Sequence, residues 1–152
     1  MNLLQLENKN IIVMGVANER SIAWGVAKRL LEVGANVIFT YRKERSKGKI
    51  EKLLTAYEDK KTAIVACDVN NDESIAKAFE QIGAEFGTVH GLVHSVAFAH
   101  AEDLKNRFLE TTREGYAFAQ DTSAYSLDAV SNAAKPYLPE GESIVTMRHL
   151  GA

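Results

Sequence analysis

Five short runs of apolar and β-branched residues are spaced along the chain, and a helical pattern separates each run from the next. The runs lie at residues 11–14, 36–40, 63–67, 91–95 and 143–147. Continuous apolar runs of this length are typical of strands that are buried on both faces of a parallel sheet. The intervening patterns predict helices over 21–33, 43–57, 72–86 and 112–135, and a polar loop near 98–110.

This alternation predicts an α/β fold with a doubly wound parallel sheet of Rossmann type, because crossovers between parallel strands are right-handed. We expect five strands in the order 3-2-1-4-5, and Asp72 as the N-cap of the third helix. Ligands of such sheets bind beyond the carboxyl ends of the strands, where the strand order reverses. The loops 15–21 and 95–99 should therefore lie side by side.

Composition limits the class of protein. A chain of 152 residues, with 46% hydrophobic and 25% charged residues, suits one globular domain over residues 1–152. A net charge of −2 does not point to nucleic acid or to a membrane surface, and no apolar stretch is long enough for a membrane span. The single cysteine, Cys67, excludes an internal disulfide, which is compatible with a cytoplasmic location. The spacing of the four histidines predicts no metal site.

The loop after the first strand is the first candidate binding element. Gly15 directly follows the strand, where a glycine lets the backbone approach a pyrophosphate. Ser21 lies where the helix begins, so its hydroxyl and the free amides there are suited to an anion. Gly25 is expected to allow close packing of this helix on the sheet. The loop lacks the G-x-G-x-x-G spacing, and a simple tight turn is the alternative.

The ends of the second and third strands carry charged candidates. Many NAD-binding folds have an acidic residue after the second strand, whereas basic residues such as Arg42 and Lys43 can meet the 2′-phosphate of NADPH. The alternative is a solvated basic surface. Asp68 lies where an adenine would be bound, although a turn or cap residue is also typical there. Cys67 is expected to be a small buried hydrophobe, because no sequence neighbour would activate it.

Several segments together carry a resemblance to a known family. They are the loop from Gly15 to Gly25, Thr40 to Ser46, Asp68-Val69, His94 to Ala99, and Gln120 to Ser126. In this order and spacing they resemble the enoyl-acyl-carrier-protein reductases of bacterial type II fatty-acid synthesis, and in particular their Gram-positive form. These enzymes are members of the short-chain dehydrogenase/reductase family. The resemblance extends over about residues 3–152.

The resemblance implies an oxidoreductase that transfers hydride from NADH or NADPH to the trans-2-enoyl thioester of an acyl carrier protein. It further implies a cytoplasmic homotetramer. The implied cofactor-binding residues are Gly15, Ser21 and Ile22 at the pyrophosphate, Arg42 and Lys43 at a 2′-phosphate, Asp68 and Val69 at the adenine, and Ser95, Val96 and Ala97 near the ribose. The implied residues of the fatty-acyl pocket are Ala97, Phe98 and Leu104.

The end of the chain departs from the family pattern. The catalytic tyrosine and lysine of the family lie on the helix after the fifth strand, beyond Ala152, so no catalytic residue is named here. Where the family has Thr-Tyr-Leu-Gly-Gly, the chain has His149 at the position of the tyrosine. We therefore expect a Rossmann domain truncated before the catalytic helix, and an inactive 152-residue chain. The alternative is a non-catalytic nucleotide-binding or interaction fragment.

Overall fold

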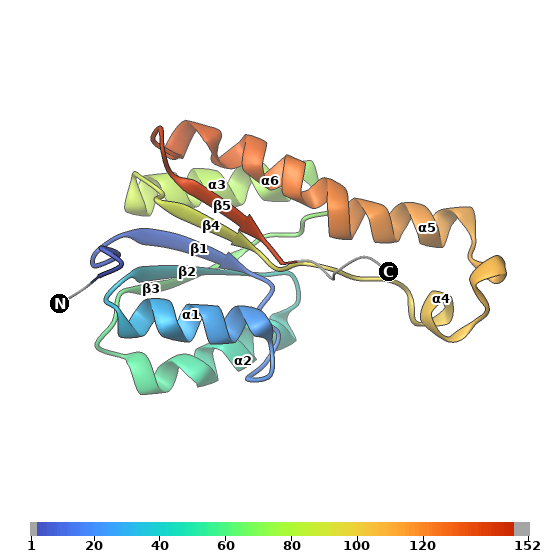
Figure 1. Ribbon diagram of the computed structural model, residues 1–152, viewed down its shortest axis with the longest axis horizontal. Helices are drawn as coiled ribbons and strands as arrows, with labels where there is room; N and C mark the ends of the chain where they lie inside the picture. Colours follow the sequence, from blue (N-terminus) through green and yellow to red (C-terminus); the bar gives the residue numbers. More distant parts are fainter. Residues whose placement is uncertain (1–2, 148–152) are drawn as a thin grey trace.

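The computed structural model describes residues 3–147, and it contains one sheet with helices on both of its faces (Figure 1). The strands are β1 (Asn10–Met14), β2 (Asn36–Tyr41), β3 (Thr62–Ala66), β4 (Gly91–His94) and β5 (Ser143–Thr146). The helices are α1 (Ile22–Glu32), α2 (Glu44–Leu54), α3 (Asp72–Phe86), α4 (Ala101–Lys105), α5 (Arg113–Gln120) and α6 (Ser126–Ala134). A π turn (Asp121–Tyr125) joins α5 to α6, and 3-10 turns lie at Thr55–Tyr57, Phe108–Glu110 and Lys135–Tyr137.

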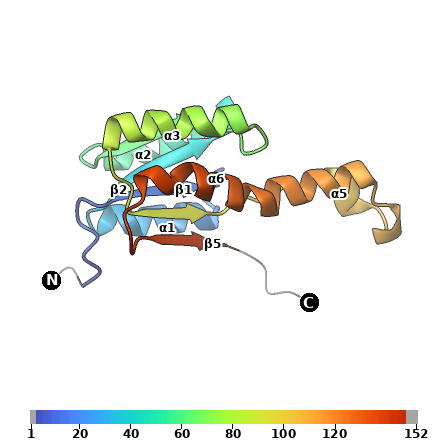
Figure 2. The same cartoon turned by 90° about the horizontal axis from the view of Figure 1, so that it is seen from above.

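The strand order is β3-β2-β1-β4-β5, and every pairing is parallel, which confirms the predicted topology. Strand β1 is central, and its Ile11 pairs with Val37 of β2 on one side and with Gly91 of β4 on the other. Helices α1 and α2 cover one face of the sheet, and α3 and α6 cover the other (Figures 1 and 2). Because all five strands are parallel, the loops that follow their carboxyl ends lie at the same edge of the sheet.

The core has two layers because successive side chains of a strand point to opposite faces. Ile12 and Met14 of β1 pack with Phe79 of α3 in one layer. Val13 packs in the other layer, in which the ring centroid of Trp24 on α1 lies 6.3 Å from that of Phe39. Trp24 thus serves helix packing. Strands β1, β2 and β4 are buried as their apolar runs predict, whereas β3 is half-buried and β5 is largely exposed, so the burial expected for the run 143–147 is wrong.

Helix α3 begins at Asp72, but its N-cap is Asn71, so the expected role of Asp72 is corrected. The side-chain oxygen of Asn71 accepts a hydrogen bond of 3.0 Å from the backbone N–H of Ser74. Asp72 lies in the first turn, where its negative charge is favourable to the helix dipole. Both residues are typical of helix starts, and only the backbone geometry distinguishes them.

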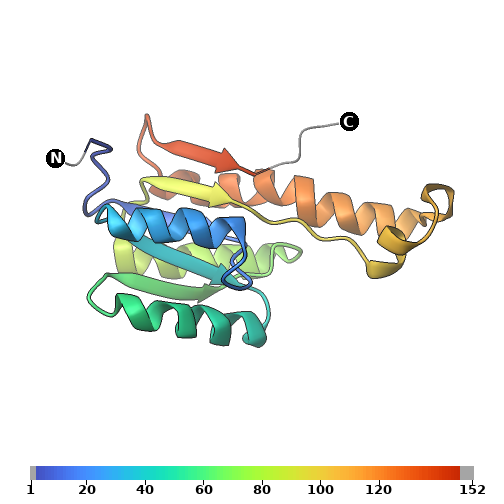
Figure 3. The same ribbon diagram turned by 60° about the horizontal axis from the view of Figure 1, so that its bottom comes forward.

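The segment expected to be a polar loop near 98–110 contains α4 and a 3-10 turn, so that expectation is wrong in part. Together with α5 this segment forms an arm that extends beyond the sheet (Figures 1 and 3). Its large apolar side chains are exposed, among them Leu104, Phe108, Leu109 and Tyr116. Within residues 3–147, none of the helices is long and apolar enough to cross a membrane.

Candidate functional site

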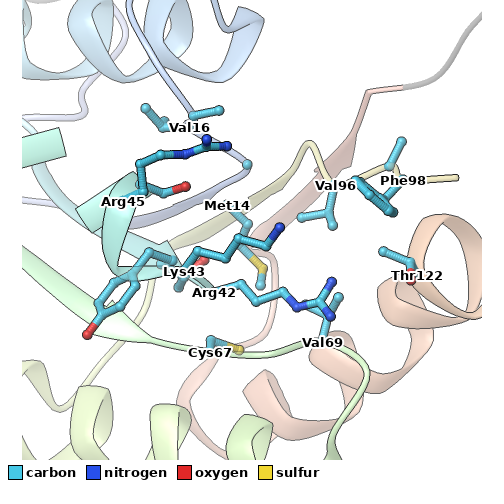
Figure 4. Close-up of a pocket in the computed structure, with 16 residues that line it drawn as sticks. Met14, Val16, Arg42, Lys43, Arg45, Cys67, Val69, Val96, Phe98 and Thr122 are labelled. Carbon is cyan, nitrogen blue, oxygen red and sulfur yellow. The ribbon is translucent and has the colours of Figure 1, made fainter. Parts of the chain in front are cut away.

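A cavity of about 270 Å³ opens at the carboxyl edge of the sheet, where the strand order reverses at β1 (Figure 4). The ends of β1, β2, β3 and β4, the start of α2 and the π turn all contribute to it. Its lining residues are Met14, Gly15, Val16, Ala17, Thr40, Tyr41, Arg42, Lys43, Arg45, Ser46, Cys67, Val69, Val96, Ala97, Phe98 and Thr122. This is the position at which doubly wound sheets bind their ligands.

Gly15 brings the loops after β1 and β4 into direct contact. Its φ is +101°, and a Cβ atom at this position would collide with the backbone carbonyl of Ser95. The N–H of Ser95 donates to the carbonyl of Met14 at 3.2 Å, which holds the two strand ends together. The loops thus lie side by side as expected, and only glycine fits at this junction.

The start of α1 differs from the expectation in detail. The Ser21 hydroxyl accepts hydrogen bonds from the N–H groups of Ala17 (2.9 Å) and Asn18 (3.2 Å), and it does not cap the helix. The serine therefore fixes the loop, and it leaves the first-turn amides of α1 suited to an anion. Neither Ser21 nor Ile22, whose side chain is 70% exposed, lines the cavity. Gly25 is exposed and a Cβ there would meet nothing within 4 Å, so its expected packing role is wrong.

A basic rim, made of Arg42, Lys43 and Arg45, borders the cavity at the end of β2 and the start of α2. Figure 4 shows the Lys43 amine directed toward the opening, whereas the Arg42 side chain extends toward Val69. Lys47 lies instead over the ring of Tyr41, 5.8 Å from its centroid. The basic run is therefore not one uniform solvated surface. Arg45 was not singled out from the sequence, although it lies in the Thr40 to Ser46 segment.

Asp68 is engaged in contacts within the protein. Its Oδ1 lies 3.6 Å from Nε of Arg42 and accepts a 3.0 Å hydrogen bond from the N–H of Asn70. The backbone N–H of Asp68 donates to the Ser74 hydroxyl at 2.8 Å. Asp68 itself does not line the cavity, whereas the next residue, Val69, does. Asp68 was expected to bind adenine, and its carboxylate also forms an ion pair with Arg42 of the basic rim.

The cavity contains no activated nucleophile among its lining side chains. Burial, reinforced by the negative charge of Asp68, raises the pKa of the Cys67 thiol to about 12. Cys67 is therefore a neutral, buried thiol near pH 7, in agreement with the reading of this residue as a small hydrophobe. The arrangement is that of a binding site with an apolar floor and a cationic rim.

The expected substrate residues fall into two groups. Val96, Ala97 and Phe98 line the cavity, and the Phe98 ring makes an edge-to-face contact with Phe118 of α5 at 5.7 Å. Leu104 lies on the exposed arm and does not line the cavity. Ser95 likewise is absent from the lining and contributes through its backbone contact with β1.

The histidines have separate environments. His94 is buried, with Nδ1 3.1 Å from the Thr146 hydroxyl and Nε2 2.8 Å from the Ser126 hydroxyl. His90 accepts a hydrogen bond from the N–H of Asn10, and the ring of His100 stacks on Phe118 on the arm. In the part of the chain that the structure describes, no group of three or more His, Cys, Asp or Glu side chains is placed to hold a metal ion. His149 lies outside the described residues.

Comparison with known proteins agrees with this geometry. A family model described as enoyl-(acyl carrier protein) reductase matches residues 15–152. The chain is 51% identical to the enoyl-acyl-carrier-protein reductase (NADPH) of Staphylococcus aureus over 98% of its own length and 58% of the relative. It is 52% identical to the corresponding protein (NADH) of Enterococcus faecalis, over 97% of the chain and 57% of that relative.

A solved structure gives the same result. The crystal structure of the Bacillus cereus enoyl-acyl carrier protein reductase with NADP⁺ and indole naphthyridinone superposes with a TM-score of 0.90 at 46% identity. That match covers 95% of this chain and 56% of the B. cereus chain. The chain thus spans a little more than half the length of the proteins it matches. On the family match, the identities and the shared fold, it belongs to the enoyl-acyl-carrier-protein reductase family.

Proposed function

We propose that the chain is the cofactor-binding part of an enoyl-acyl-carrier-protein reductase, which transfers hydride from NADH or NADPH to trans-2-enoyl thioesters in fatty-acid elongation. In this proposal residues 1–152 form one dinucleotide-binding domain. The observation that carries it is the cavity at the strand-order reversal, where a glycine-dependent junction meets a basic rim. The S. aureus protein is named for NADPH and the E. faecalis and B. cereus proteins for NADH, while the B. cereus protein was solved with NADP⁺, so the relatives support a nicotinamide dinucleotide as the ligand.

The residues present fit a dinucleotide. Gly15 keeps the backbone open at the junction of β1 and β4, and the first-turn amides of α1, after Ser21 and at Ile22, are oriented for the pyrophosphate. Val69, next to Asp68, offers an apolar wall for the adenine. Ser95, Val96 and Ala97 follow β4 and border the ribose on the far side. When bound, the cofactor supplies the hydride, and the chain's own residues bind and orient it.

The two cations at the end of β2 have different roles in this proposal. Arg42 is already paired with Asp68, so its charge is partly used within the protein. The Lys43 amine faces the cavity and, among the described residues, makes no ion pair. Lys43 is therefore the main partner for a 2′-phosphate, and NADPH is the preferred cofactor.

Partners are proposed on the same basis. An acyl carrier protein presents the enoyl thioester, and Ala97 and Phe98 border the acyl chain. The exposed apolar side chains of the arm, including Leu104 and Tyr116, support assembly into a homotetramer. We also propose a cytoplasmic location, which the lone, buried Cys67 supports.

Calorimetric titration of the chain with NADPH and NADH tests the cofactor proposal. NADPH should bind more tightly at low salt, and its advantage should shrink between about 0.01 and 1 M salt, as the Debye length falls from ~30 to ~3 Å. Lys43→Gln should reduce the preference. Lys49→Gln is the control, because Lys49 lies on α2, is exposed and does not line the cavity. A folded chain that binds neither dinucleotide would refute the proposal.

A further inference from the structure

The long helix changes its hydrogen bonding where it passes the cavity. In the π turn, the N–H of Ser126 donates to the carbonyl of Asp121, five residues earlier, and not to that of Thr122, four residues earlier. Thr122 is buried and lines the cavity. Single π turns within α-helices are frequent at functional sites, so the contacts of this turn are informative.

The displaced carbonyl of Thr122 is satisfied by a side chain. The hydroxyl of Ser126 donates to it at 2.6 Å, and the same hydroxyl lies 2.8 Å from Nε2 of His94. The other ring nitrogen of His94, Nδ1, lies 3.1 Å from the Thr146 hydroxyl. The π turn is therefore anchored to β4 and β5 through a buried network.

The loop after β3 is attached to the same turn. Nδ2 of Asn70 donates to Oδ2 of Asp121 at 2.8 Å and to the Thr122 hydroxyl at 2.7 Å. The backbone N–H of Asn70 donates to Asp68, which in turn pairs with Arg42. A chain of contacts thus links the π turn to the wall at Val69 and to the basic rim.

The loop after β4 is attached through the next residue. The Ser123 hydroxyl accepts from the N–H of Phe98 at 3.0 Å and lies 3.3 Å from the Phe98 carbonyl, to which it donates. One side chain therefore holds both backbone groups of a residue that lines the cavity. Phe98 lies on the side of the cavity away from Lys43 and Arg45 (Figure 4).

We propose that the π turn is the element that positions the two walls of the cofactor site, and that Asn70 and Ser123 are separate positioning residues. Asn70 places the wall at Asp68 and Val69, and Ser123 places the wall at Ala97 and Phe98. The proposal rests on dinucleotide binding at this cavity. It predicts that the two side chains affect different halves of the ligand.

Binding of two probes separates these roles. NADPH spans both walls, whereas adenosine 2′,5′-bisphosphate represents the adenosine half alone. Ser123→Ala should weaken the binding of NADPH roughly three- to tenfold, which corresponds to the loss of one net hydrogen bond. The affinity for the bisphosphate should stay within about twofold of the wild-type value. Ser123→Thr keeps the hydroxyl and should restore NADPH binding. Asn70→Ala should weaken the binding of both probes, because both contain the adenosine half.

Matched controls are Ser131→Ala and Asn132→Ala on α6, which remove the same side-chain groups away from the cavity and should change neither affinity. Equal loss of both probes in Ser123→Ala, or no loss of either, would overturn the inference. A general loss of stability would lower the affinity for both probes and would not produce a difference between them. Thermal unfolding of each variant measures any such loss of stability.

Amide hydrogen exchange of the ligand-free chain keeps this inference separate from the proposed function. Ser123→Ala should accelerate exchange in residues 95–99 and leave 68–71 unchanged, and Asn70→Ala should do the reverse. If the wild-type chain binds neither probe, the proposed function fails, and this exchange pattern alone decides on the positioning roles. Equal acceleration in both loops by each variant would refute them.

Discussion

Replacing Gly15 with alanine should destabilise the whole fold, although it adds only one methyl group. The φ of +101° disfavours an L side chain by about 1–3 kcal/mol. The added Cβ also collides with the carbonyl of Ser95, so the ends of β1 and β4 must move apart. That movement weakens the Ser95 to Met14 hydrogen bond, worth about 0.5–1.5 kcal/mol. The free energy of unfolding should therefore fall by about 2–4 kcal/mol.

Urea unfolding followed by circular dichroism measures this loss, and a thermal scan should show Tm lower by about 5–15 °C. Gly25→Ala is the matched control. Gly25 lies exposed within α1, and its new Cβ meets nothing within 4 Å, so alanine should be neutral or stabilise by up to about 1 kcal/mol. An unchanged unfolding midpoint in Gly15→Ala would refute the argument from backbone geometry and close approach.

Four further outcomes are expected. Because burial and the charge of Asp68 raise the pKa of Cys67 to about 12, its thiol should react with iodoacetamide at neutral pH only after denaturation. The folded state holds this proton more tightly, so its contribution to stability should fall as pH rises from about 9 to 12 in urea titrations. Phe79→Ala should cost about 3–5 kcal/mol of unfolding free energy, against less than about 0.5 for the exposed Phe108→Ala. Ser126→Ala should cost about 1–3 kcal/mol by leaving buried polar groups unpaired, and urea midpoints check both.

The parallel sheet followed from the sequence because uninterrupted apolar runs such as 11–14, alternating with helical patterns, are typical of a sheet covered on both faces, and 3-2-1-4-5 is the usual strand order of such doubly wound sheets. Gly15 was identified as a special position because a glycine directly after such a strand lets the backbone approach a pyrophosphate, whereas the close neighbour that the structure shows is the Ser95 carbonyl. These features depend on local residue type and on the period of hydrophobic residues. Both quantities can be read from the sequence without knowledge of the tertiary contacts.

Other features depend on contacts between distant segments. The ion pair of Arg42 with Asp68 and the bonds from Asn70 to the π turn join different loops of the sheet edge, and no local pattern encodes them. The π turn interrupts a segment that the pattern predicts as one helix, because its polar residues suit either hydrogen-bonding scheme. The packing role expected for Gly25 was wrong, because a Cβ at this position would meet no atom within 4 Å. Whether another segment packs against a helical glycine depends on tertiary contacts, which the local sequence does not show.

The central position of β1 has a consequence for synthesis of the chain. The backbone N–H of Asn10, at the start of β1, donates a hydrogen bond to Nδ1 of His90, just before β4, although the two residues are 80 positions apart in the sequence. At a synthesis rate of about 5–20 residues per second, the apolar strand 10–14 waits roughly 4–16 s on the ribosome for its second neighbour. During that interval one of its edges has unpaired backbone groups, which invites association with other chains. We therefore expect slow, chaperone-assisted maturation, with yield improving at lower expression temperature.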